Sequence, residues 1–523
     1  MHPSFYPLLA LASPLALLAV ALLAWRRPGA RPTAVRRLGA AASFFGLLVA
    51  AGCGALVAAQ GSLATPLLGV GGVGLSIRLD PLAVVMLGMV ALLAVVIFRF
   101  SATYLEGDPR HGAFLGRLAA TVASVSLLVV AGNLGLFFLA WVATSLTLHR
   151  LLLFYPERRG ARIAARKKFL VARLGDLALL GAFALLVERF GTGELGALFE
   201  AAAGAAPGPA LTGATLLIAF AALLKSAQFP THGWLLEVVE TPTPVSALLH
   251  AGILNAGPFL VVRYAALMEL GGAAQALLVV VGGFTALFAS SALTTQPRVK
   301  VALGYSSAAH MGFMLMVCGL GAYAAAILHL VAHSFYKAHA FLSSGSAVEQ
   351  ASAARVPGPR RTRSAVRIAL GIGLALAVYA GLGLALGVSL DTDPTTLAIG
   401  AILVMGLAQL LTPALDGTGG LPVALAAAVM ALSVALAFFG LEAGTAALLH
   451  TALPDRGPRD ALTLGLTVGV LGAFGLAVLA QIVGARRPDA PFLRAFYVHL
   501  RNGFYANALF DRLVGAQRLP TRR

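Results

Sequence analysis

The stretch LTGATLLIAFAALLKSAQFPTHGW, from Leu211 to Trp234, places a lysine at the end of a long apolar run. A charged lysine at the centre of a membrane helix costs roughly 2.5–3.5 kcal/mol of insertion free energy. Lys225 is followed within a dozen residues by His232 and Glu237, so polar chemistry is concentrated here. A charge retained at such a cost indicates a functional group inside a membrane protein, provided that the rest of the chain is of that class.

Composition supports that class. Of the 523 residues, 59% are hydrophobic and only 11% are charged, whereas soluble domains carry about 25% charged residues. Apolar runs of about twenty residues recur along the chain, and each is long enough to cross a bilayer. Alternating strand patterns are absent. We therefore predict an all-α polytopic membrane protein.

We expect about fifteen transmembrane helices, with boundaries good to a few residues. Their ranges are 5–25, 39–59, 79–100, 113–131, 133–154, 168–187, 210–228, 243–265, 273–293, 298–320, 322–345, 365–388, 395–413, 420–441 and 461–484. We group them into N-terminal helices (1–112), a core (113–350), C-terminal helices (351–485) and a basic amphipathic tail (486–523).

The net charge of +18 comes from basic residues that gather in loops and in the tail. They are Arg26, Arg27, Arg31, Arg36 and Arg37 after the first span; Arg158, Arg159, Arg162, Arg166, Lys167 and Lys168 after the fifth; and Arg355, Arg360, Arg361, Arg363 and Arg367 after the eleventh. With fifteen crossings all these loops fall on one side, which the positive-inside rule makes the cytoplasm. The N-terminus is then outside and the C-terminus inside. Because the charge is not spread over one face, no nucleic-acid partner is expected.

Several common sites are not expected. Cys53 and Cys318 lie far apart in apolar spans without a CxxC pair, so neither a disulfide nor a metal site is predicted. The segment GVGGVG, Gly69–Gly74, formally matches GxGxxG, but it follows no predicted strand, and we interpret it as a flexible loop. No P-loop is present to supply energy from a nucleotide.

The spans instead carry an unusual set of ionisable residues: Lys225, His250, Lys300, His310, His329, His333 and Lys337. Steps of four place His329, His333 and Lys337 on nearly one face of a helix. Such a row is not expected to face lipid and should point toward other polar groups and water. Histidine and desolvated lysine both exchange protons near neutral pH, so the row suits a proton or cation path.

Each residue also has a structural interpretation. Lys225 could snorkel to the interface, and Lys300 could be an interfacial anchor. His250 and His310 could be core histidines with satisfied hydrogen bonds. The prolines of TPTP, Thr241–Pro244, are expected to break a helix and to free backbone groups that line a cavity.

The tail from Arg486 to Arg523 alternates basic and aromatic residues. The aromatic ones are Phe492, Phe496, Tyr497, Phe504, Tyr505 and Phe510. Exposed aromatic anchors among charges are typical of a docking surface, here for a cytoplasmic partner. The alternative is a basic helix that lies on anionic lipid.

These motifs carry a family resemblance. LLKSAQFPTHGWLLEVVETPTPVSALLHAG, KVALGYSSAAHMGFM and HLVAHSFYKAHAFLSSGS resemble the proton-translocating, antiporter-like subunits of respiratory complex I and Mrp antiporters, and RLDPLAVVMLGMV and FLVARLGD extend the likeness over about residues 75–350. The resemblance implies two inverted five-helix repeats and a discontinuous seventh span. It makes Lys225 the central lysine, His250 the polar residue of the eighth span, and His329, His333 and Lys337 the polar axis of the eleventh.

FPTHGWLLEVVETPTPVSALLHAGILNAG, SLTLHRLLLFY and the tail YVHLRNGFYANALFDRL are similar to the DabB family, membrane subunits of inorganic-carbon accumulation complexes. This implies an energy-coupling transporter subunit of the bacterial inner membrane that conducts protons or another cation down their gradient. Its partner would be a DabA-like cytoplasmic zinc protein that resembles β-carbonic anhydrases and converts CO2 to bicarbonate. The chain itself would be no enzyme and hold no cofactor. The alternatives are a proton-pumping subunit of NADH:quinone oxidoreductase, an Mrp-type cation/proton antiporter subunit, and a scaffold.

Two positions depart from the complex I pattern. That pattern has a glutamate directly after the fifth-span tryptophan, whereas Val142 follows Trp141 here. Asp176 and His149 are the candidates to replace it. The twelfth span also lacks the lysine expected in the second repeat. The sequence therefore does not match the complete proton channel of the complex I subunits.

Overall fold

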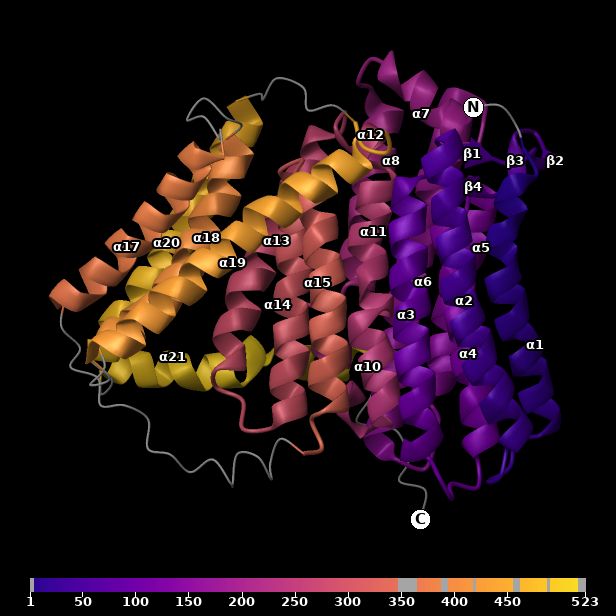
Figure 1. Cartoon of the computed structure of the whole chain (residues 1–523), viewed down its shortest axis with the longest axis horizontal. Helices are drawn as coiled ribbons and strands as arrows, with labels where there is room; N and C mark the ends of the chain where they lie inside the picture. The colour runs from indigo at the N-terminus through magenta and orange to yellow at the C-terminus, as the bar shows by residue number, and fades with distance from the viewer. Residues whose placement is uncertain are drawn as a thin grey trace.

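The computed structural model describes residues 4–346, 365–386, 394–416, 420–454, 461–486 and 490–515. Most of the residues before 343 form upright helices that stand side by side in one slab, whereas the described helices between residues 365 and 486 are inclined (Figure 1). The first half of the slab contains η1 (Tyr6–Leu11), α1 (Ala12–Arg26), α2 (Thr33–Gln60), α3 (Pro81–Tyr104), α4 (His111–Val129), α5 (Leu134–Leu152), α6 (Arg159–Phe190), α7 (Leu195–Ala203) and α8 (Pro209–Lys225).

The second half begins after the non-helical residues 226–232, which follow the end of α8. It contains α9 (Gly233–Glu237), η2 (Val238–Glu240), α10 (Thr243–Ala251), η3 (Ile253–Asn255), α11 (Ala256–Arg263), α12 (Ala265–Met268), α13 (Gly272–Leu293), α14 (Val299–Gly319) and α15 (Tyr323–Leu342), followed by α17 (Ala365–Ala385), α18 (Pro394–Asp416), α19 (Gly420–Leu449) and α20 (Ala461–Arg486). The tail forms α21 (Pro491–Arg501), η4 (Gly503–Tyr505) and α22 (Ala506–Leu513), and α21 runs across the lower ends of the upright helices (Figure 1).

Each of the fifteen predicted spans overlaps one of these helical segments, and the all-α membrane fold is confirmed. Eleven described segments are long and apolar enough to cross a membrane, and three shorter apolar helices accompany them. The 20 residues of α15 are in neither group. Its length is sufficient, but the histidines and lysine of its polar row lower its hydropathy.

The helices pack around one large apolar core, most of which lies between α1 and α15, and a small second cluster joins α17, α18 and α19. Glycines allow α13 and α14 to approach closely, since a Cβ on Gly282 would lie 2.6 Å from the Gly312 carbonyl oxygen. Small residues at helix crossings are typical of membrane proteins, where the hydrophobic effect does not drive helix association. This crossing places the polar residues of α14 and α15 at fixed positions.

The seventh span is discontinuous, as the resemblance implied. Helix α8 ends at Lys225, and a non-helical turn of residues 226–232 leads to the five-residue α9. The expected role of TPTP differs, because Pro242 is the N-cap of α10 and Pro244 lies in its first turn. Proline is tolerated there since the first backbone N–H groups of a helix need no internal acceptor. TPTP therefore starts a helix, and the interruption of that span lies at Gly252 and η3 instead.

The prediction of a flexible loop at Gly69–Gly74 is wrong. Strands β2 (Leu68–Val70) and β3 (Val73–Leu75) form an antiparallel hairpin, and β1 (Leu63–Ala64) pairs with β4 (Arg78–Leu79). Gly71 and Gly72 have φ of +60° and +77°, the conformation that a two-residue hairpin turn requires. Asn133 accepts from Gly74 N at 3.0 Å and donates to Gly72 O at 3.0 Å, which fixes the hairpin on α5.

The basic segment after the fifth span is also not a loop. Helix α6 begins at Arg159 and has 32 residues, so it is about 48 Å long and extends beyond a hydrocarbon core of about 30 Å. Lys167 and Lys168 are buried within it. The basic residues Arg355, Arg360, Arg361 and Arg363 lie outside the described residues.

Candidate functional site

Lys225 is the last residue of α8, and its side chain turns toward α5. The ammonium nitrogen lies 4.0 Å from the centroid of the Trp141 ring and 3.5 Å from the Trp141 carbonyl oxygen. Val142, which occupies the position of the glutamate in the complex I pattern, packs against the apolar core. The face of an aromatic ring attracts a cation by about 0.5–2 kcal/mol. The ring of Trp141 is therefore the group that stabilises the positive charge of Lys225 at this position.

A polar cluster surrounds this contact at the buried face of α6. Lys168 Nζ donates to Ser145 O at 2.6 Å and to Ser145 Oγ at 2.8 Å, although the sequence analysis placed Lys168 in a loop. Arg173 pairs with Asp176 at 2.6 Å, and Asp176 attracts the ammonium groups of Lys225 and Lys168. Of the two proposed substitutes for the missing glutamate, Asp176 thus interacts with Lys225. His149 lies against the Phe169 ring, 5.3 Å between centroids.

A small cavity adjoins Lys225 and Lys168, with Ser145 and Trp234 in its wall. Its volume of about 20 Å³ exceeds the 10–15 Å³ or so that one water molecule occupies on this measure. Because lysine and serine groups line it, a water there would find hydrogen-bond partners. The cavity offers a position from which Lys225 could exchange a proton.

Side chains at the helix breaks connect α8 to α15. Ser226, directly after Lys225, donates to Leu254 O at 2.9 Å. The next residue, Asn255, donates from Nδ2 to Ala251 O at 2.7 Å and to Ser334 Oγ at 2.8 Å. All of these side chains are buried. The interruptions in α8 and in α10–α11 are thus held by polar groups that reach the polar face of α15.

On α15, Lys337 is fully buried and donates to Ser306 Oγ of α14 at 2.6 Å. His250 stacks on Phe341, with 4.2 Å between ring centroids, and interacts electrostatically with Lys337. Lys300 is separate from this group, since its ammonium bonds Thr243 Oγ1 at 3.0 Å at the start of α10. That placement favours the anchor interpretation of Lys300.

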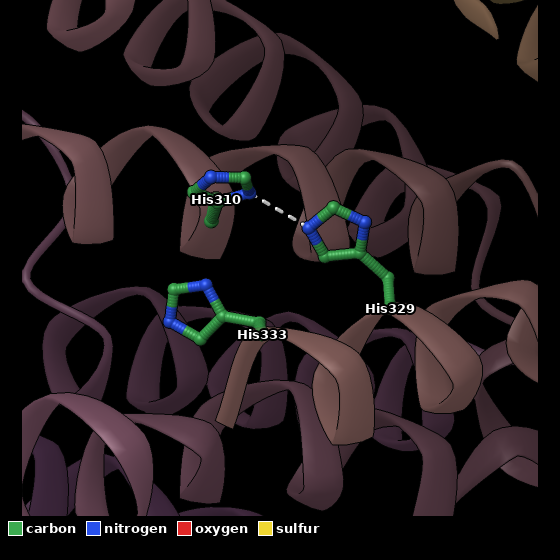
Figure 2. A group of neighbouring side chains, drawn as sticks. All are labelled: His310, His329 and His333. Carbon is green, nitrogen blue, oxygen red and sulfur yellow. Dashed lines mark hydrogen bonds between the residues drawn. The ribbon is translucent and has the colours of Figure 1, made fainter. Parts of the chain in front are cut away.

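Three neighbouring histidines, His310, His329 and His333, extend this polar face (Figure 2). His310 Nδ1 and His329 Nε2 are 2.8 Å apart and share a hydrogen bond between α14 and α15. His333 lies beside both, with ring centroids 4.9 Å from His310 and 6.4 Å from His329. Its side chain is 3% exposed, and neither ring nitrogen has a hydrogen-bond partner among the described residues.

The tail packs partly on its own chain. Phe504 lies 5.7 Å from Phe288, and the Phe510 ring lies 5.7 Å from Lys167 Nζ. Phe492, Tyr497 and Tyr505 are exposed. Phe504 and Phe510 therefore contact the membrane domain, although Phe504 is also exposed, as are the other three predicted docking residues.

An ionic contact that the sequence analysis missed attaches this tail to the broken helix. Lys167 Nζ bonds Glu237 Oε1 of α9 at 2.6 Å and forms an ion pair with Asp511 of α22. Asn507 of α22 bridges Lys167 and Glu237, since it accepts from Lys167 at 2.9 Å and donates to Glu237 at 3.0 Å. Lys167 contacts the tail, and the next residue, Lys168, belongs to the polar cluster around Lys225. The two contacts therefore start from adjacent positions of α6.

A second missed ion pair lies at the opposite end of the bundle. Asp80 Oδ2 accepts from Arg78 at 2.8 Å and from Arg263 at 2.5 Å, while Oδ1 caps α3 by accepting from Ala83 N at 2.8 Å. Burial alone would raise the pKa of the Asp80 carboxyl, but the two arginines and these hydrogen bonds lower it to about 2. The aspartate therefore ties α3 to α11 as a buried anion. Only the capping pattern Asp-Pro could have pointed to it from sequence.

Comparison with known proteins agrees with this geometry. A family model described as the transmembrane region of NADH:quinone oxidoreductase/Mrp antiporter proteins matches residues 131–368, and one for the N-terminus of complex I chain 5 matches residues 69–115. The chain is 37% identical to a probable inorganic carbon transporter subunit, DabB2, of Halothiobacillus neapolitanus over 97% of its own length and 93% of the relative's.

Two further matches are more limited. A probable inorganic carbon transporter subunit DabB of Hydrogenovibrio crunogenus is 42% identical over 54% of each chain. The solved Mrp complex from Dietzia sp. contains a chain that superposes with a TM-score of 0.62 at 27% identity, covering 98% of this chain and 60% of that one. Together with the polar axis through α8, α10 and α15, these matches show that the chain belongs to the DabB family within the antiporter-like membrane subunits of the complex I and Mrp type.

Proposed function

We propose that this chain is the energy-coupling membrane subunit of an inorganic-carbon transport complex. It conducts protons, or another cation, down their gradient along the polar face from Lys225 to Lys337. The flux drives a DabA-like cytoplasmic zinc protein that converts CO2 to bicarbonate, and it makes that hydration effectively one-way. The chain is oriented with its N-terminus outside and its tail in the cytoplasm.

The observation that carries this proposal is the partly buried Lys225 at the interruption of an apolar helix. A permanent charge at that depth is unfavourable, and its nearest neighbour is a ring rather than a dedicated counterion. Serine and asparagine side chains lead from there to the fully buried Lys337. Two lysines joined by polar groups within an apolar bundle suit stepwise transfer of a small cation.

Composition of the purified complex separates this function from its alternatives. A soluble zinc protein supports the proposal. A redox arm with flavin and iron–sulfur clusters would indicate an NADH:quinone oxidoreductase, and a set of small membrane subunits would indicate an Mrp-type antiporter. The names of the full-length relative and of the half-length match favour the first outcome.

The direct test is inorganic-carbon uptake by cells that carry this chain and its partner. Uptake should stop when a protonophore dissipates the proton gradient, or when a sodium ionophore dissipates the sodium gradient if sodium is the coupling ion. Cells with the partner alone give the background. Uptake that persists after both gradients are lost would contradict gradient coupling.

A further inference from the structure

The histidine cluster has a geometry that the polar path does not require. His310, His329 and His333 each offer a ring nitrogen, and these three atoms lie within 4.8 Å of one another. The expectation of no metal site rested on the two distant cysteines and did not consider histidines from separate helices. Helix α14 supplies one residue and α15 supplies two, at a spacing of one turn (Figure 2).

We propose that His310, His329 and His333 form a binding site for a divalent transition-metal ion, with Zn²⁺ the best fit, and that the bound ion blocks the cation path. Zn²⁺ is commonly held by three imidazoles, with a water or an anion in the fourth position. Imidazole also suits Cu²⁺, Ni²⁺ and Co²⁺, so selectivity comes from geometry.

The metal-free arrangement is close to the geometry of a bound one. A tetrahedral ion with bonds of about 2.0–2.1 Å holds its ligand nitrogens about 3.3 Å apart. The His310–His329 pair, at 2.8 Å, must open by about half an ångström, and the third nitrogen must approach from within 4.8 Å. His333 has the most to gain, because its buried ring nitrogens have no partner among the described residues.

The charged groups beside the cluster explain the effect of a bound ion. His310 and His329 are half-buried, and His333 is buried. The titratable groups that face the cluster are Lys337 and His250. A bound dication would place its charge beside Lys337 and disfavour a second cation at that step. Blockage of the path therefore rests on the proposed function, whereas binding does not.

Binding is tested on the full chain, purified in detergent with an affinity tag free of histidine and stripped of metal with EDTA. Equilibrium dialysis against Zn²⁺ should give one ion per chain, and Co²⁺ should give visible absorption bands typical of a tetrahedral nitrogen site. His310→Gln, His329→Gln and His333→Leu should each weaken Zn²⁺ binding by at least about tenfold.

His339→Gln is the matched control, because His339 is exposed on the same helix and lines a different, mainly apolar cavity with Leu92 and Phe335. It should bind Zn²⁺ like the unaltered chain. Lys337→Met should tighten binding, since it removes the neighbouring positive charge. The site would be overturned if a variant with all three histidine substitutions bound as much Zn²⁺ as the unaltered chain, or if the unaltered chain bound none.

Blockage is tested separately by inorganic-carbon uptake. Added Zn²⁺ should inhibit uptake and EDTA should restore it, both in the unaltered pair and in His339→Gln. If Zn²⁺ leaves uptake unchanged although the purified chain binds the ion through these histidines, the proposed blockage of the cation path is wrong. If uptake proves independent of ion gradients, the proposed function fails, while the Co²⁺ spectrum still decides the metal site.

Discussion

The ammonium of Lys225 lies 4.0 Å from the centroid of the Trp141 ring, beside a valine where the complex I pattern has a glutamate. A ring holds a cation by about 0.5–2 kcal/mol, whereas removing one partner of a buried ion pair costs about 3–5 kcal/mol. The lysine can therefore lose its proton or change its position at a modest cost. With Val142 in the place of that carboxylate, the Trp141 ring is the group nearest to the ammonium, and Lys225 is a weakly held charge.

The first prediction concerns Asp176, the carboxylate that attracts Lys225 and Lys168. Asp176→Asn keeps the size of the side chain but leaves the basic cluster without this counter-charge. We expect inorganic-carbon uptake to fall at least about tenfold, which corresponds to about 1.4 kcal/mol of lost interaction. Asp176→Glu should retain most of the uptake.

The matched control for Asp176 is Glu200→Gln, which neutralises an exposed carboxylate on α7. Uptake by that variant should equal uptake by the unaltered chain at the same membrane abundance. Normal uptake by Asp176→Asn would mean that the cluster needs no counter-charge, and that Asp176 only pairs with Arg173.

The second prediction concerns the tail. Phe492 and Tyr497 of α21 are exposed, and truncating aromatic anchors at the centre of an interface costs about 2 kcal/mol or more each. We expect the double variant Phe492→Ser, Tyr497→Ser to reduce recovery of the DabA-like partner by at least about tenfold, and deletion of residues 486–523 to abolish it. Co-purification with the membrane chain is the measurement.

Phe504→Ser provides a contrast, because Phe504 packs on Phe288 within the chain. It should lower the stability of the tail more than it changes partner recovery. If α21 only lies on lipid, the exposed aromatic residues will affect membrane association of the isolated tail, and partner recovery will be unchanged by the double variant.

The third prediction concerns stability and pH. The pKa of Asp80 is lowered from 3.8 to about 2 because Arg263 and Arg78 outweigh burial. Its stabilising contribution is therefore fully present above pH 3.8 and is lost as the pH falls toward 2. Asp80→Asn breaks the buried ion pair and should cost about 3–5 kcal/mol near neutral pH.

The measurement for Asp80 is the apparent unfolding temperature in detergent at pH 7 and at pH 3. The difference between Asp80→Asn and the unaltered chain should be large at pH 7 and smaller at pH 3. A difference of the same size at both pH values would show that charge does not explain the stabilisation.

The membrane spans could be predicted because each apolar run is a local signal. Boundaries failed where a helix extends beyond the bilayer, as at Arg159–Lys168 in α6. The glycine turn at Gly71 and Gly72 has a recognisable sequence, but the absence of apolar alternation concealed the hairpin. Its stability comes instead from Asn133, which is 61 residues away from Gly72.

The candidate site was predictable only along single helices. The spacing of His329, His333 and Lys337 is visible in the sequence, whereas His310 joins them through the packing of α14 on α15. The same limit applies to Lys167, whose partners Glu237 and Asn507 lie 70 and 340 residues away. When its partners are not known, a lysine in a basic segment is predicted to be a solvated charge.

The central claim is that Lys225 releases and accepts a cation rather than anchoring α8. Lys225→Met should preserve the fold, since it removes a charge and keeps an unbranched stem, and it should abolish inorganic-carbon uptake. The most direct measurement is uptake by Lys225→Arg at matched membrane abundance, because a guanidinium stays protonated and cannot release the ion. We expect uptake by this variant to be lost or reduced at least about tenfold, a change of about 1.4 kcal/mol. Near-normal uptake would show that a fixed positive charge suffices, and would contradict a role for Lys225 in conduction.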